Sequence, residues 1–307
     1  MNKYLGDIRD IFFNNIKKKF LKNKKFHILT NDADVFSLKS LRDHKRFIDV
    51  GVAEQNLINI AAGIAKNNNM PIVYGFCTFL TFRCYEQLRF NIARHKLDVK
   101  IVGIGPGYSF SYDGPTHHGT QDTYLMYLIP EFEIINISDN NLAYSVSKNL
   151  EKIKGPVYIR IDKGNLNYNS KINYDIKKGF EITYKSKSNQ ILIITTGYFC
   201  KLANDVANNH KGVSVLNFFK YKSFDKKNFL KIIKKYSKIV IYDESSKSGG
   251  ITTILANFFI EKKIFTDVEV LASKDEQSFL YSQDRDIFLK KMGIYRNKLS
   301  KLLNKLK

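Results

Sequence analysis

The segment VKIVGIGPGYSFSYDGPTHHGTQD, residues 99–122, joins an apolar run of strand length to a long polar loop. The loop is rich in Gly, Pro, Ser and Asp, the usual residues of turns, and it also carries the adjacent pair His117 and His118. A surface turn is the simplest interpretation of such a loop. In open α/β sheets, however, ligands bind in the loops that follow the carboxyl ends of the strands. The segment therefore predicts a strand of an α/β sheet, with a candidate ligand site in its loop.

Similar apolar runs recur along the chain, and segments of helix length separate them. The runs are residues 26–30, 71–76, 99–105, 132–137 and 156–161, then 191–197, 213–218, 238–244 and 267–272. Strands that alternate with helices are typical of parallel sheets with helices on both faces. We therefore predict an α/β fold of two domains, each a mostly parallel sheet flanked by helices.

The clearest candidate for a domain boundary is a polar, irregular stretch that begins near Gly164 and ends near Gln190. We place a linker at residues 169–189, between a first domain at residues 1–168 and a smaller second domain at residues 190–307. A chain of 307 residues with 44% hydrophobic content is long and apolar enough to bury a sizeable core.

The net charge of +21 raises the question of nucleic-acid binding, because such a charge attracts phosphate polymers. The lysines are spread along the chain, however, with apolar residues at helical spacing between them. This pattern is typical of the solvated faces of amphipathic helices. The sequence also lacks zinc-finger, RNA-recognition and basic-zipper motifs. We therefore expect no nucleic-acid partner.

Other features of the sequence bear on where the protein works. Its first residues lack the apolar core of a signal peptide, and no run reaches the ~18 apolar residues of a membrane span. Cys77, Cys84 and Cys200 show no paired spacing, which argues against a disulfide framework and against a zinc site. We expect a cytoplasmic protein with no membrane partner and no metal site of its own.

Two more segments follow predicted strands and carry candidate residues. Residues 47–65 set Glu54 at the start of an apolar helix, where a carboxylate often serves only the helix dipole. A carboxylate buried among apolar neighbours can also share a proton with a ligand. Phe79, Phe82 and Tyr85 follow at helical spacing, and aromatic residues in such a pattern usually belong to the core. Both pairs of alternatives stay open on the residues alone.

Taken together, six stretches resemble the pyrimidine-binding and C-terminal domains of the transketolase family of thiamine diphosphate enzymes. Any one of them is weak evidence, but all six occur in the order and at the spacing of the family over nearly the whole chain. They are FIDVGVAEQN, CTFLTFRCYEQLR, YDGPTHHGTQD, GPVYIRIDKG, ITTGYF and VIYDESSKSGG.

The resemblance implies a role for each residue of the cofactor group. Glu54 would contact the aminopyrimidine ring of thiamine diphosphate and promote its imino tautomer, so that the neighbouring amino group can take a proton from the thiazolium carbon. Phe79, Phe82 and Tyr85 would form the pocket for the pyrimidine ring. Glu54 would thus be both a cofactor ligand and a catalytic residue.

The resemblance also implies a substrate role for the loop after residue 105. Asp113 and His117 would contact hydroxyl and carbonyl oxygens of the donor, and His117 would be catalytic because it steadies charge as the adduct forms. His118 would be a second polar contact of the substrate. A metal site at the two histidines is not expected, since adjacent loop residues seldom aim both rings at one ion.

Binding of a substrate phosphate is less clear from the sequence. Arg9 and Lys163 match positions where the family has basic phosphate ligands, with lysine in place of the usual arginine. Lysine lacks the bidentate fork of arginine but still binds phosphate as a point charge. A solvated loop lysine is the alternative for Lys163. Gly105 stands about where sugar-phosphate transketolases carry a histidine that helps to bind phosphate, so the usual acceptor is in doubt.

One part of the family pattern is missing. Full-length transketolases begin with a domain in which a glycine-aspartate and asparagine motif holds a divalent metal, such as Mg²⁺, on the cofactor diphosphate, and no such motif occurs here. The resemblance therefore implies one subunit of a split transketolase, with the pyrimidine half of the cofactor bound here. A partner subunit would hold the diphosphate and metal, and two copies of each would form a heterotetramer.

Three functions stay open. The first is transfer of a two-carbon ketol unit between sugars, which we prefer. The second is decarboxylating chemistry on the same cofactor, of the deoxyxylulose phosphate synthase type or as a 2-oxo acid dehydrogenase beta subunit. The third is a binding subunit without catalysis, and the presence of Glu54, Asp113 and His117 argues against it. The donor and acceptor sugars are not fixed by the sequence.

Overall fold

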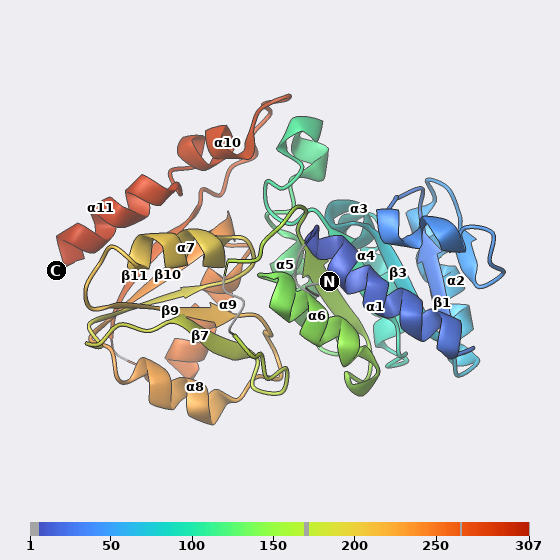
Figure 1. Ribbon diagram of the computed structural model, residues 1–307, viewed down its shortest axis with the longest axis horizontal. Coiled ribbons are helices and arrows are strands. Elements are labelled where there is room, and N and C mark those ends of the chain that lie inside the picture. Colours follow the sequence, from blue (N-terminus) through green and yellow to red (C-terminus); the bar gives the residue numbers. More distant parts are fainter. Residues whose placement is uncertain (1–5, 169–171, 265, 307) are drawn as a thin grey trace.

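A computed structural model describes residues 6–168, 172–264 and 266–306, and these form two α/β units that lie side by side (Figure 1). The predicted fold class is confirmed for both units. The predicted strands are all present, with ends that agree to within two residues. Three parts of the predicted domain division lie outside the described residues. They are the first and last ends of the domains, at 1–5 and 307, and the start of the linker, at 169–171.

The first sheet is parallel throughout, in the order β2-β1-β3-β4-β6-β5. Its central strands are buried along almost their whole length, as expected for a sheet that is covered on both faces. The short strand β2 was missed in the sequence, because three residues at a sheet edge give little pattern. The strands are β1 Phe26–Thr30, β2 Phe47–Asp49, β3 Met70–Phe76, β4 Lys100–Ile104, β5 Glu133–Asn136 and β6 Val157–Ile161.

Helices cover both faces of this sheet. Helix α1 (Ile8–Lys22) packs beside α6 (Asn140–Lys148) over one face, where Figure 1 shows them next to each other. Helix α2 (Glu54–Lys66) lies on the other face with the remaining helices of this unit. These are α3 Cys77–Phe82, α4 Tyr85–Gln87, the π-helical turn Leu88–Ala93 and α5 Asp122–Tyr127.

The second sheet has the order β11-β10-β8-β9-β7, and every pair except β7 with β9 is parallel. Its strands are β7 Phe180–Tyr184, β8 Ile191–Thr195, β9 Val213–Phe218, β10 Lys238–Ser246 and β11 Asp267–Ser273. Its helices are α7 Phe199–Ala207, α8 Lys226–Ile233, α9 Ile251–Glu261, α10 Arg285–Lys291 and α11 Arg296–Leu306. Helix α9 packs against α5 of the first unit, and the N-terminus of α10 also reaches that unit, where Arg285 contacts Asp162.

One stretch differs from the sequence-based expectation. The region predicted as polar and irregular contains β7, which pairs antiparallel with β9 at the edge of the second sheet. An edge strand needs only one apolar face, so β7 can be held with Phe180 and Thr183 buried and its other residues half-buried. The predicted domain limits remain a prediction.

The remaining features concern the surface and the cysteines. The lysine-rich helices α1, α8 and α11 each bury an apolar face, as the spacing of their residues predicts. All three cysteines are buried and free. Among the described residues, no helix combines the length and apolar character needed to cross a bilayer.

Candidate functional site

Several chain segments converge at the carboxyl ends of the first sheet. Asn31 follows β1, Phe76 ends β3, and the loop after Gly105 follows β4. Because parallel strands place their carboxyl ends at one edge, these segments meet beside the N-terminus of α2, which begins at Glu54. The candidate site is built at this edge.

Glu54 is 5% exposed and lies in the first turn of α2, where the helix dipole favours a carboxylate. Its Oε1 accepts hydrogen bonds from Asn31 Nδ2 at 2.9 Å and from Arg83 Nη1 at 3.0 Å. Its Oε2 accepts none from any residue that the structure describes. Val52, two residues earlier in the chain, is 74% exposed and does not contribute to this burial. Glu54 is therefore a buried carboxylate with one oxygen left open.

Asn31 fixes the orientation of that carboxylate, and the sequence analysis missed it. The residue is 6% exposed, and its own Oδ1 has no partner in the described residues. A Cβ on Gly75 would lie 2.2 Å from Asn31 Oδ1, so only glycine leaves room for this side chain. The one available signal was its position, directly after the strand at residues 26–30.

Arg83 is the second residue that the sequence analysis missed. Its guanidinium stacks over the ring of Phe79, 3.9 Å from the centroid, and forms an ion pair with Glu54 while its side chain stays 46% exposed. The break between α3 and α4 places it there, because the helical run stops at Phe82 and resumes at Tyr85. Nothing in the sequence distinguished this arginine from a solvated one.

The three aromatic residues of this segment do not behave alike. Tyr85 packs against the core of the first domain, which is the ordinary outcome for aromatic residues at helical spacing. Phe79 is only half-buried, and Phe82 is 42% exposed. The break in the helix thus leaves both rings at least partly exposed, and Phe79 is linked to Glu54 through Arg83.

His117 joins this group from the loop after β4. Its ring meets Phe76 and Phe79 edge-on, with centroids 4.7 and 4.9 Å apart, and its Nδ1 lies 3.0 Å from Thr116 Oγ1. Partial burial lowers the pKa of His117, and the opposing charge of Asp113 does not reverse the shift. The imidazole is therefore neutral at physiological pH and can both donate and accept a hydrogen bond.

The loop holds His117 through its own turns. Asp113 is exposed and closes one 3₁₀ turn, Ser111–Asp113, while His117 closes the next, Pro115–His117. Between them Gly114 has a φ of +79°, a conformation that other residues rarely adopt. Thr78 Oγ1 of α3 donates to the Thr116 carbonyl at 2.8 Å and ties the second turn to the helix.

His118 faces a different part of the molecule. It is 8% exposed and packs edge-on against Tyr108 and against Phe288 of α10, with centroids 5.2 and 4.7 Å away. Its Nε2 is buried without a partner in the described residues, and burial lowers the pKa of this ring. The structure thus places the two histidines apart, His117 with the aromatic group and His118 in the contact between domains.

The two predicted phosphate ligands lie near the end of β6. Arg9 donates from Nε and Nη2 to Asp7 at 2.9 and 2.8 Å, and Asp7 also accepts the Gly164 N–H at 2.9 Å. Lys163 is exposed, and its ammonium lies 4.2 Å from the centroid of Phe110. Asp7 therefore holds Arg9 near Lys163 at the carboxyl end of β6. Its carboxylate already accepts hydrogen bonds from the guanidinium of Arg9.

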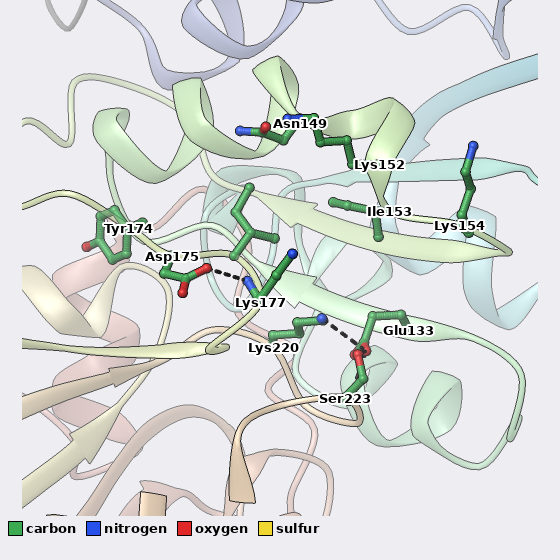
Figure 2. Close-up of a pocket in the computed structure, with 11 residues that line it drawn as sticks. Glu133, Asn149, Lys152, Ile153, Lys154, Tyr174, Asp175, Lys177, Lys220 and Ser223 are labelled. Carbon is green, nitrogen blue, oxygen red and sulfur yellow. Dashed lines mark hydrogen bonds and ion pairs between the residues drawn. The ribbon is translucent and has the colours of Figure 1, made fainter. Parts of the chain in front are cut away.

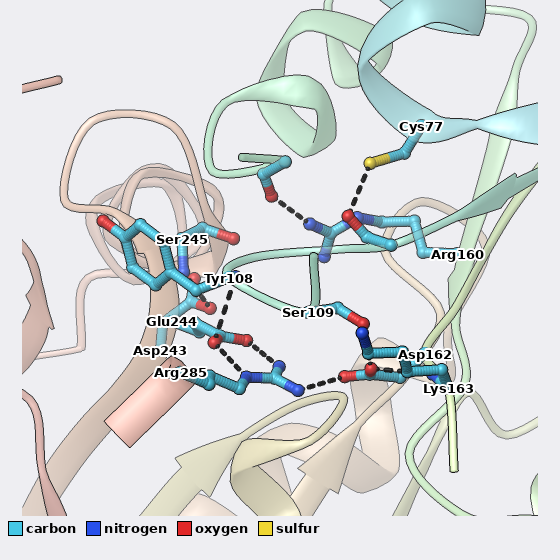
Figure 3. Close-up of polar contacts among 12 residues, drawn as sticks. Cys77, Tyr108, Ser109, Arg160, Asp162, Lys163, Asp243, Glu244, Ser245 and Arg285 are labelled. Atoms are coloured by element: carbon cyan, nitrogen blue, oxygen red, sulfur yellow. Dashed lines mark hydrogen bonds and ion pairs between the residues drawn. The ribbon is translucent and has the colours of Figure 1, made fainter. Parts of the chain in front are cut away.

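A buried ionic cluster lies between the domains (Figure 3). Arg285 of α10 donates to Asp162 Oδ2 at 2.8 Å and to Glu244 Oε1 at 2.7 Å. Burial alone would lower the pKa of Arg285, but the two carboxylates hold it above its ordinary value. The cluster joins the end of β6 to the end of β10, and the sequence analysis assigned it no role.

A second buried ion pair supports the other end of the His117 loop. Arg160 Nε donates to Asp122 Oδ2 at 2.8 Å, and its Nη2 donates to the Gly119 carbonyl at 2.9 Å. Figure 3 shows Arg160 next to the loop that carries Tyr108 and Ser109. The described residues contain no group of three or more acidic, histidine or cysteine side chains that could hold a metal ion.

Two domain families match most of this chain. Residues 13–169 match the family described as the transketolase pyrimidine-binding domain, and residues 181–285 match the transketolase C-terminal domain. The 6-deoxy-6-sulfo-D-fructose transketolase subunit SqwH of Clostridium sp. is 28% identical over 75% of this chain and 74% of its own length.

The 1-deoxy-D-xylulose-5-phosphate synthases of Francisella philomiragia and Alkaliphilus oremlandii are 28% and 30% identical over 85% and 75% of this chain. The matches span only 42% and 38% of those synthases. Among solved structures, a split gene transketolase described as an inactive beta4 tetramer has a TM-score of 0.82 at 21% identity and 98% coverage of both chains. A Campylobacter jejuni transketolase has a TM-score of 0.77 at 16% identity, over 98% of this chain and 47% of that one.

Proposed function

Because the chain belongs to the transketolase family, we propose that it is one subunit of a split thiamine diphosphate enzyme that transfers a two-carbon ketol unit between sugars. The observation that carries this proposal is the open Oε2 of the buried Glu54, whose partner Arg83 stacks on the half-buried ring of Phe79. A buried carboxylate whose second oxygen accepts no hydrogen bond can accept one from a bound ligand and can share a proton with it.

The residues at this edge fit the pyrimidine half of the cofactor. Thiamine diphosphate, when bound, supplies the carbanion chemistry that neither sugar nor side chain can provide. Glu54 Oε2 would hold a proton against a ring nitrogen, while Asn31 and Arg83 fix the other oxygen. The rings of Phe79 and Phe82 would cover the pyrimidine and exclude water.

The loop after β4 would handle the sugar. His117 is neutral and half-buried, so it would donate a hydrogen bond to a donor hydroxyl or carbonyl oxygen. Asp113 lies one turn earlier and would accept a bond from a second hydroxyl. His118 is a weaker candidate because its ring is packed against α10. Arg9 and Lys163 would bind a substrate phosphate, provided that the phosphate competes with Asp7 for Arg9.

A partner subunit would complete the site. The chain contains no family motif for the diphosphate and its metal, so both would be held by the partner. Two comparisons support this arrangement, since one relative is named as a transketolase subunit and one structural neighbour is described as an inactive tetramer of beta chains. We infer a heterotetramer of two copies of each subunit.

Decarboxylating synthesis from pyruvate is the second candidate, because many of the curated relatives are deoxyxylulose phosphate synthases. An assay separates the two. The chain is co-expressed with the product of the neighbouring upstream gene, and the complex receives an aldose acceptor with either a ketose phosphate or pyruvate. Ketol transfer predicts a lengthened sugar without carbon dioxide. Release of carbon dioxide from pyruvate, with no reaction of any ketose, would replace our proposal with the synthase type.

A further inference from the structure

A cavity of about 360 Å³ lies at the opposite edge of the first sheet from the candidate site. Glu133, the first residue of β5, forms part of its wall, whereas Glu54 lies at the carboxyl ends of the strands. The other walls come from the turn after α6, the segment that precedes β7 and the connection between β9 and α8. The lining residues are Glu133, Asn149, Lys152, Ile153, Lys154, Tyr174, Asp175, Ile176, Lys177, Lys220 and Ser223 (Figure 2).

The charge of this cavity is strongly positive. Four lysines line it, against the two carboxylates Glu133 and Asp175. Both oxygens of Glu133 are already occupied, because Oε1 accepts the N–H of Lys222 at 3.1 Å and Oε2 accepts the N–H of Ser223 at 2.9 Å. Ser223 Oγ also donates to Oε2. These donors are neutral, so Glu133 keeps its negative charge, and the four lysines still exceed the two carboxylates by two charges.

Lys220 is the most informative of these lysines. Its side chain is 11% exposed, and its ammonium has Glu133 Oε2 at 4.0 Å as its only ion-pair partner among the described residues. Figure 2 shows this long contact between Lys220 and Glu133. The Nζ of Lys220 donates no hydrogen bond to any residue that the structure describes. A buried ammonium without hydrogen bonds is unfavourable unless an anion or water reaches it.

The remaining lysines approach from other segments. Lys152 and Lys154 follow α6, Lys177 precedes β7, and none of the three forms an ion pair within the described part of the chain. Exposed lysines are usually only solvated, but here they share one cavity with a buried cation. The apolar side chains of Ile153 and Ile176 line the same cavity and give it a surface that a ring can contact.

We propose that this cavity binds a small molecule that carries phosphate, such as a nucleoside diphosphate. Four ammonium groups face the two carboxylates Glu133 and Asp175, which leaves two positive charges in excess for the phosphate of a ligand to balance. Lysine binds phosphate as a point charge, and the cavity volume lies within the usual range of about 300–1,000 Å³ for ligand sites. The site joins both domains and is separate from the cofactor site, so it is a candidate for regulation.

The test is calorimetric titration of the whole chain with inorganic pyrophosphate and with ADP, at a salt concentration of about 0.15 M to suppress non-specific attraction. We expect one site on the wild type, weakened by about tenfold or more in Lys220→Gln and in Lys152→Gln/Lys177→Gln. The second variant changes only exposed residues, so it remains informative if Lys220→Gln fails to fold. Lys24→Gln/Lys25→Gln removes the same charge from an exposed segment elsewhere and should bind as the wild type does.

Two outcomes would overturn the proposal. One is the absence of binding by both probes up to about 1 mM, which is weaker than a specific site requires. The other is an equal loss in the control variant, which would mean that net charge alone attracts the probes. Lys163→Gln tests a further outcome. A selective loss of binding in that variant would place the binding at the end of β6 and would also overturn the proposal.

Discussion

Two buried carboxylate clusters at the ends of parallel strands differ in one respect. In the cluster between the domains, Arg285 donates hydrogen bonds to Asp162 Oδ2 and to both oxygens of Glu244. The other oxygen, Asp162 Oδ1, accepts from Ser109 and from the Lys163 N–H. At the candidate site, Asn31 and Arg83 both bind the same oxygen of Glu54. The first cluster is closed, whereas the second leaves an acceptor open.

The exposure of the two arginines follows the same division. The side chain of Arg285 is 16% exposed, and that of Arg83 is 46% exposed. Buried charges that satisfy one another are typical of a structural role, because removing one member leaves the others unpaired. A buried carboxylate with one open oxygen and an exposed partner retains the capacity to bind a ligand. Burial alone therefore does not identify a functional carboxylate.

The largest expected effect is on catalysis through Glu54. In the reconstituted complex, Glu54→Gln should lower turnover by about a hundredfold to ten-thousandfold, because the amide keeps the shape but cannot hold the proton. The thermal midpoint should stay near that of the wild type, since Gln can still accept from Asn31 and Arg83. A variant within about threefold of wild-type activity would contradict the assigned role.

The closed cluster should show the opposite behaviour. Arg285→Met should lower the free energy of unfolding by about 3–5 kcal/mol, because two buried carboxylates lose their partner. Arg83→Met is the matched control and should lose less, because Arg83 is 46% exposed and Glu54 keeps the hydrogen bond from Asn31 at the helix N-terminus. Denaturant titration of both variants measures the difference. Equal losses would remove the distinction between the clusters.

A smaller effect is expected from His117. His117→Ala should weaken use of a ketose donor by about 1–3 kcal/mol in kcat/KM, as expected when a buried polar group of the substrate loses its partner. Cofactor affinity, followed by calorimetry on the complex, should not change. The conservative variant His117→Asn tests the role further, because it restores a donor and should recover part of the loss. Equal loss of cofactor binding would point to a structural role.

The smallest effect concerns pH. Burial holds the pKa of His118 below its ordinary value of 6.5, so the unfolded chain binds the proton more readily than the folded one. The stability that depends on neutral His118 is therefore present above that value and is lost as the pH falls below it. Unfolding of His118→Gln should depend less on pH than that of the wild type between about pH 7.5 and 5.5. Parallel curves would contradict this.

Periodicity predicted the framework of the fold well. The runs of strand length gave the strands of both sheets because parallel strands are buried on both faces. It failed for β2 and β7, which lie at or near the edges and bury little. The family resemblance is confirmed by the two matched domains.

The site was only partly predictable from the sequence. Glu54 and His117 stand out by residue type and context, and the structure brings both to the same aromatic group. Asn31 and Arg83 do not stand out, because their roles depend on a strand end and a helix break that bring distant segments together. His118 could not be separated from His117 by sequence, since only the packing of α10 directs its ring elsewhere.

The most direct test of the central claim is the binding of thiamine diphosphate with Mg²⁺ by calorimetry. In the function proposed above, this chain supplies the pyrimidine side alone, around the open oxygen of Glu54. That function predicts weak binding by the isolated chain, and tight binding only after the partner subunit is added. Sub-micromolar binding by the isolated chain would contradict it.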